Sequence, residues 1–202
     1  MKNKIQVAYP ESVFITTSAE TVYVADFTER TGSARKVEVH TSIPNAPGDN
    51  SSMECLKLNN KLPIDLVFNV FGDHQFKDKE GKDVTHCECC FFPSLNVGHA
   101  FIAFVEIKDC KPGKISDYKE KVKEQIQSTL KLFKSSSIVE KGKVYGIISF
   151  PRRSKVAFNE YFYRDNYELT KWVKNYGIHL IASNEIDVVS DKVIRPVSLS
   201  IL

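Results

Sequence analysis

The sequence predicts an α/β fold, because segments typical of strands and of helices alternate over the C-terminal two thirds of the chain. Hydrophobic residues make up 42% of the 202 residues and charged residues 26%, which is ordinary for a folded protein. This length is enough for one domain with a sizeable core. No internal repeat and no low-complexity tract interrupts the pattern.

The first third of the chain reads mainly as strands. β-branched and aromatic residues are concentrated in two short runs, and a third run alternates charged and apolar residues, which predicts strands at 13–15, 21–24 and 36–40. Residues 43–52 collect prolines, glycine, asparagine and serine and predict a loop. We therefore divide the chain into a β-rich N-terminal segment, 1–52, and a core, 53–202, which together form one compact domain.

The middle of the chain contains the segments that matter most for function. Residues 62–71 are apolar and fit a strand or a helix equally well, whereas 84–92 and 101–108 read as strands separated by a turn at 93–98. The run 101–108 is apolar almost to its end, as expected for a central strand covered on both faces.

Helical periodicity is clearest over residues 116–134. Asp117 is placed to cap this helix, with Glu120 three residues later, and apolar residues recur every three or four positions. A buried strand is expected at 144–150, a second helix at 168–176 with Gly177 at its end, and a last strand at 178–182.

A candidate site follows from the end of the central strand. Side chains alternate along a strand, so Glu106 and Lys108 lie on the same face. Each is costly to desolvate alone, but with a second carboxylate they can hold a divalent cation and steady a phosphate. Glu88, which we place midway in the preceding strand, is that second carboxylate. Gln125 borders the buried face of the long helix and needs a polar partner there.

Three segments resemble a known family. Residues 88–92 (Glu-Cys-Cys-Phe-Phe), 104–108 (Phe-Val-Glu-Ile-Lys) and 124–130 (Glu-Gln-Ile-Gln-Ser-Thr-Leu) are similar to motifs of the PD-(D/E)XK nuclease superfamily. The resemblance covers the stretch from Val84 to Phe133. It implies a restriction-endonuclease-like core, with a central mixed β-sheet flanked by helices and here a β-rich N-terminal extension.

The resemblance also assigns roles to the site. It implies that Glu88 and Glu106 bind Mg²⁺, with Mn²⁺ as a substitute, that Lys108 orients or activates the attacking water, and that Gln125 supports the site. The implied activity is the hydrolysis of phosphodiester bonds, with DNA as the expected substrate and the choice between DNA and RNA left open. Metal and lysine together stabilise charge on the phosphate. A homodimer or a partner subunit is compatible with this class.

Other interpretations stay open. The family usually has Asp where this chain has Glu88, so a catalytically inactive nuclease fold that binds nucleic acid or another protein is the main alternative. A structural α/β domain with an incidental Glu-x-Lys is another. Cysteine and histidine are crowded enough to raise a zinc site or a cysteine nucleophile, although no pair of C-x-x-C motifs is present; the residues concerned are His86, Cys87, Cys89, Cys90, His99 and Cys110.

Net charge and targeting signals say little about the function of the chain. The formal net charge of +3 permits an anionic partner without requiring one. The basic residues most suited to contact a nucleic-acid backbone are Lys111, Lys114, Arg152 and Arg153. We find neither an apolar run of membrane-spanning length nor a signal-peptide pattern and so expect a cytoplasmic protein that does not bind membranes, with reduced thiols.

Overall fold

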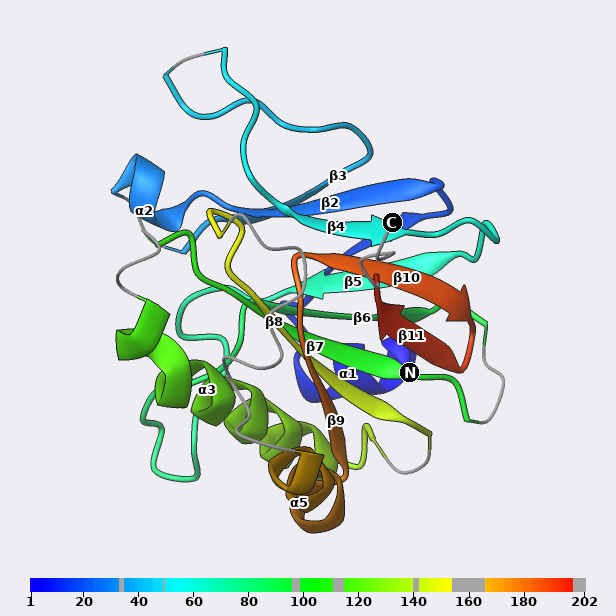
Figure 1. Cartoon of the computed structure of the whole chain (residues 1–202). Coiled ribbons are helices and arrows are strands. Elements are labelled where there is room, and N and C mark those ends of the chain that lie inside the picture. The colour runs from blue at the N-terminus through cyan, green and yellow to red at the C-terminus, as the bar shows by residue number, and fades with distance from the viewer. Residues whose placement is uncertain are drawn as a thin grey trace.

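The computed structural model describes residues 1–32, 35–48, 50–95, 99–110, 115–139, 142–153 and 166–197. The described elements form three layers (Figure 1): a layer of helices, a six-stranded sheet A in the middle, and a five-stranded sheet B on the other side. This is an α/β fold, as the order of elements predicts, but it has two mixed sheets where we expected one central sheet.

Sheet A provides the central layer. Its order is β1-β5-β6-β7-β8-β9, and these strands span Val13–Thr17, Leu66–Val70, Cys89–Pro93, Ile102–Ile107, Val144–Ser149 and Ile178–Ala182. Pairing is antiparallel from β1 to β7 and parallel from β7 to β9. A parallel connection needs a crossover, and helices occupy the β7–β8 and β8–β9 crossovers. The ambiguous run 62–71 contains a strand, β5.

Sheet B combines the N-terminal and C-terminal parts of the chain. Its order is β11-β10-β4-β2-β3, with only β10 and β4 parallel, and its strands in chain order are β2 Thr21–Asp26, β3 Val37–His40, β4 Leu56–Asn59, β10 Glu185–Ser190 and β11 Val193–Pro196. The expectation that the strand at 178–182 is the last one is wrong, because β10 and β11 follow it. The alternation of residues 185–188 was the signal for β10.

Four helices lie in the described part of the chain: α1 Lys2–Ala8, α2 Thr28–Thr31, α3 Ile115–Ser135 and α5 Asn166–Tyr176. The long helix starts earlier than expected, so Asp117 lies inside its first turn rather than capping it, where its charge still favours the helix dipole. Gly177 has φ of +71° directly after α5, as a C-terminal glycine should. None of the described helices is long and apolar enough to cross a membrane.

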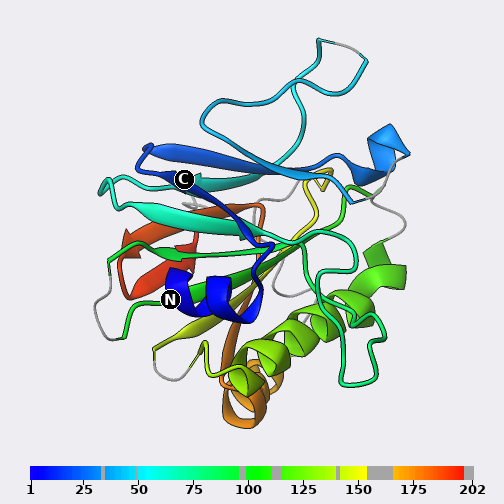
Figure 2. The ribbon, with the colours of Figure 1, turned by 180° about the vertical axis from the view of Figure 1, so that it is seen from behind.

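The inner strands β6, β7 and β8 of sheet A are buried on both faces, whereas the edge strand β1 is largely exposed. Along β7, Ile102 and Phe104 belong to the apolar cluster beneath the helices, whereas Ala103, Val105 and Ile107 belong to the cluster shared with sheet B. Ile5 of α1 joins the helix-side cluster, and Figure 2 shows this helix beside the strands of sheet A. By the same alternation, Glu106 points toward the helices, so a carboxyl group enters an otherwise apolar layer.

The close approach of α3 to sheet A generates a first prediction. A Cβ atom at Gly146 of β8 would lie 2.6 Å from Leu180 Cδ2 and 3.0 Å from Ile126 Cγ2. We expect Gly146→Ala to lower the free energy of unfolding by about 1–3 kcal/mol, because the packed layer must shift to accept the methyl group. Urea denaturation measures this.

The matched control is Gly72→Ala, where the added Cβ meets no atom within 4 Å and φ is not positive. This control should change stability by no more than about 0.5 kcal/mol. Equal effects of the two substitutions would contradict the close packing of Leu180 of β9 and Ile126 of α3 around Gly146.

Candidate functional site

Glu88 lies directly before β6 rather than in the middle of a strand. The strand expected at 84–92 starts only at Cys89, so our placement of Glu88 midway along it is wrong. The Glu88 backbone is nevertheless tied into sheet A, because its N–H donates to Val105 O at 2.9 Å and its carbonyl accepts from Phe71 N at 3.0 Å. These bonds fix the carboxyl group beside the end of β7.

The structure brings Glu88, Glu106 and Lys108 together. The Lys108 ammonium lies between the two acids, with Nζ 2.7 Å from Glu106 Oε1 and 3.2 Å from Glu88 Oε1. Both acids are almost fully buried, with exposed fractions of 2% for Glu88 and 0% for Glu106. Two carboxylates that accommodate one cation between them form an arrangement that a divalent ion can also use.

Gln125 supports the site through the backbone instead of contacting an acid. It is buried on α3, and its Nε2 donates to His86 O at 3.0 Å. One turn further along, Thr129 Oγ1 accepts from Cys87 N at 2.9 Å. The helix therefore holds the two residues that immediately precede Glu88.

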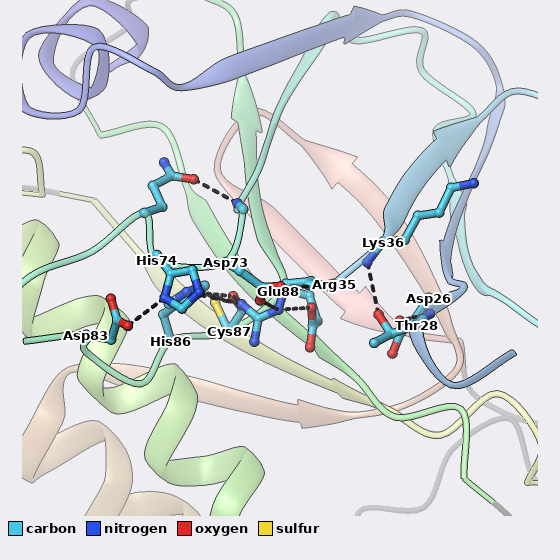
Figure 3. Close-up of polar contacts among 12 residues, drawn as sticks. Asp26, Thr28, Arg35, Lys36, Asp73, His74, Asp83, His86, Cys87 and Glu88 are labelled. Atoms are coloured by element: carbon cyan, nitrogen blue, oxygen red, sulfur yellow. Dashed lines mark hydrogen bonds and ion pairs between the residues drawn. The ribbon is translucent and has the colours of Figure 1, made fainter. Parts of the chain in front are cut away.

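Sequence reasoning missed Arg35, which comes from the segment before β3. Its Nε lies 3.0 Å from Glu88 Oε2, and its Nη1 lies 2.6 Å from His86 Nδ1 and donates to Cys87 O at 3.3 Å. Figure 3 shows the guanidinium pointing at this group of residues. Arg35 lies far from Glu88 in the chain and outside the family motifs, so no local pattern indicated it.

Burial dominates the electrostatics of the acids. Desolvation raises the pKa of Glu106 to about 8, against the opposing effect of Lys108 and with a further rise caused by Glu88. Desolvation also raises the pKa of Glu88, although Lys108 and Arg35 work against it, and the buried Asp26 of β2 adds to the rise. Burial alone would lower the pKa of Lys108, but the two acids raise it overall.

A second charged cluster adjoins the site. Asp109, which is 1% exposed, accepts from Arg30 Nε at 2.8 Å and from Arg152 Nη2 at 3.1 Å, and its Oδ1 lies 2.8 Å from Arg152 Nε. Arg30 also pairs with Glu54 at 2.6 Å. These contacts tie α2 and the loop before β4 to the ends of β7 and β8.

The residues expected to contact nucleic acid are only partly placed. The Arg152 guanidinium forms an ion pair with Asp109. Arg153 is half-buried, and its backbone N–H donates to Phe150 O at 2.9 Å. Lys111 and Lys114 lie outside the described residues. Of the four, the structure thus places Arg152 and Arg153, and Arg152 is paired with a buried acid.

The structure gives little support to the zinc site and the cysteine nucleophile that the sequence raised. Cys87, Cys89 and Cys90 are fully buried, and desolvation raises the pKa of each thiol, which opposes the thiolate that a nucleophile or zinc ligand needs. Within the described ranges, no three His, Cys, Asp or Glu side chains are grouped so that they could hold a metal ion.

The two acids still fit a magnesium ion. Mg²⁺ keeps several waters and often takes only one or two protein carboxylates, so a group of three is not required. Glu106 Oε2 and Gln125 Oε1 are buried oxygens without a hydrogen-bond partner among the described residues. Buried acceptors of this kind are costly unless a cation or a donor meets them.

Comparison of the chain with protein-family models, with curated proteins and with solved structures found no match. The fold class is thus established by the arrangement of the elements themselves. Function has to be argued from the site.

The burial of Glu106 leads to a prediction about pH. Its pKa is raised from about 4.5 to about 8 in the folded state, so folding favours the protonated form. The stability linked to this group is fully present below pH 4.5 and is lost as the pH rises through 8. We expect the stability of the native protein, relative to Glu106→Gln, to fall by a few kcal/mol across this window.

Urea unfolding at a series of pH values tests the expectation, because the glutamine cannot titrate. The control is Glu124→Gln, which removes an exposed carboxyl group from α3. A difference between the native protein and Glu106→Gln that stays constant with pH would rule out a perturbed Glu106.

Proposed function

We propose that the protein is a divalent-metal-dependent nuclease that hydrolyses phosphodiester bonds in DNA. The observation that carries the proposal is the convergence of Glu88, Glu106 and Lys108 at one buried point, with Gln125 fixing the backbone beside them. Glu88 comes from the residue before β6, Glu106 and Lys108 from the end of β7 and the residue after it, and Gln125 from α3. Incidental surface charges would not be buried together in this way.

The order of the elements supports the same class. Three antiparallel strands, β5, β6 and β7, are followed by α3 and then by β8, which is parallel to β7. An acid directly before β6, a Glu-x-Lys at the end of β7 and a glutamine on α3 follow in the same chain order as the motifs of the PD-(D/E)XK resemblance, which supports the proposal. We therefore propose that this part of the chain is a restriction-endonuclease-like core.

Each residue has a definite task in this proposal. Glu88 and Glu106 would hold Mg²⁺, which when bound supplies a Lewis acid and an activated water. Lys108, which has to leave its place between the acids, is close enough to stabilise charge on the phosphate or to orient the water. Gln125 takes no part in the chemistry. It keeps the segment before Glu88 in position by donating a hydrogen bond to His86 O.

A second candidate function is a noncatalytic DNA-binding module with the same fold. One observation favours it: Glu88 is already paired with both Lys108 and Arg35, so its charge is satisfied without a metal. A chain that had lost catalysis would be expected to replace metal ions with such internal cations. The two candidates differ in whether the acids bind a metal.

Calorimetric titration with Mn²⁺ separates these candidates. For a nuclease we expect binding to the native protein and loss of binding in both Glu88→Ala and Glu106→Ala, because each variant removes one of two ligands. Cleavage of plasmid DNA should fall at least about 100-fold in Lys108→Ala, since an electrostatic stabiliser of the transition state is lost.

Glu124→Ala, which removes an exposed acid of α3, is the control and should bind and cleave like the native protein. If the native protein binds DNA but takes up no Mn²⁺ with or without DNA present, the nuclease is excluded and the noncatalytic module is supported. Each variant is compared with the native protein by urea denaturation, so that unfolding is not mistaken for a lost site.

A further inference from the structure

Arg35 links the buried acids to a groove on the surface. The groove has a volume of about 690 Å³ and is walled by residues of β1 and β3 and by the loop after β5. Arg35 and Asp73 both line it, and the Arg35 side chain is 16% exposed. The same guanidinium reaches inward to Glu88 Oε2 at 3.0 Å, so one side chain faces both solvent and the candidate site.

The base of this side chain is held independently of Glu88. The backbone N–H of Arg35 donates to Asp73 Oδ2 at 2.9 Å, and its Nε lies 3.8 Å from Asp73 Oδ1 (Figure 3). Asp73 therefore keeps the residue at the site even when the contact to Glu88 is broken. The remaining side-chain torsions can then redirect the guanidinium without a change in the strands.

The charges around the acids balance when both acids are ionised. Both oxygens of Glu88 face a cation, because Oε1 meets Lys108 and Oε2 meets Arg35, while Glu106 Oε1 meets Lys108. A divalent ion bound by the two carboxylates would create an excess of positive charge and would repel both cations. A phosphodiester carries one negative charge and offsets half of this excess if it enters with the metal.

We propose that Arg35 is a phosphate-binding residue of this site, which holds Glu88 in the absence of metal and transfers to a DNA phosphate when a divalent ion takes Glu88. The inference rests on the proposed nuclease function. Arginine suits the exchange, because its planar donors match a carboxylate and a phosphate in the same bidentate manner. Arg35 consequently weakens metal binding to the free protein and strengthens DNA binding to the metal-loaded protein.

The two effects are coupled and reciprocal. If metal raises the affinity for DNA by some factor, DNA must raise the affinity for metal by the same factor. Removing Arg35 should change the two affinities in opposite directions. A residue that only stabilised the fold would instead weaken both.

The test compares Arg35→Gln with the native protein in two titrations. Calorimetry with Mn²⁺ on the free protein should give binding about tenfold tighter in the variant, because a competing cation is gone; one removed charge near the ion is worth roughly this much after screening. Fluorescence anisotropy with a labelled DNA duplex should show that Mn²⁺ raises the DNA affinity of the native protein about tenfold, and that the variant loses this gain.

Two further variants make the result specific. Arg195→Gln removes the same charge from an exposed arginine of β11, 67% exposed, and should behave like the native protein in both titrations. Arg35→Lys keeps the positive charge near Glu88, so its Mn²⁺ affinity should stay close to the native value while part of the gain in DNA affinity is lost. It also provides a readout if the glutamine variant is unstable.

Failure of this inference differs from failure of the proposed function. If the native protein binds Mn²⁺ and DNA, and Arg35→Gln and Arg35→Lys match it in both titrations, the role of Arg35 is overturned and the nuclease stands. If both variants lose affinity for Mn²⁺ as well as for DNA, Arg35 acts only in holding the site together, and the exchange is also overturned. A native protein that binds no Mn²⁺ under any condition overturns both.

Discussion

Two carboxyl groups buried on either side of one ammonium group form the contact on which the rest of the site depends. Removing Glu88, Glu106 and Lys108 from water costs several kcal/mol for each unpaired ion, so the three must meet at short range. They do so only if β6 and β7 pair in the observed register, with Cys89 opposite Val105. A shift by one residue would turn Glu106 toward sheet B and break the arrangement.

Sheet B contributes to the site as well as to the core. Arg35 precedes β3 and reaches Glu88, while Arg30 of α2 follows β2 and reaches Asp109 directly after Lys108. Both arginines arrive at the same end of sheet A, where β7 and β8 finish. The N-terminal strands thus serve two purposes: they cover one face of sheet A, and they deliver the cations that balance its buried acids.

In the proposed function, this charge balance lets the same arrangement of side chains exist both with and without a bound metal. When both acids are ionised, Lys108 and Arg35 offset the repulsion between the two buried carboxylates. In the proposed nuclease, the same cations would become available to a phosphate once a metal takes their place at Glu88. The loss of pairing within the protein is then offset by pairing with the substrate, so metal and DNA are expected to bind more strongly together than separately.

The sequence by itself determined the elements whose signals are local. Helical periodicity located α3 and α5 closely, and the apolar run ending in Glu106 and Lys108 located β7, because burial imposes a repeat that short windows display. Only the tertiary structure decided which sheet each N-terminal strand joins, that β10 pairs with the distant β4, and that Arg35 contacts Glu88. These are contacts between residues far apart in the chain, set by layer packing and charge pairing, and no local pattern encodes them.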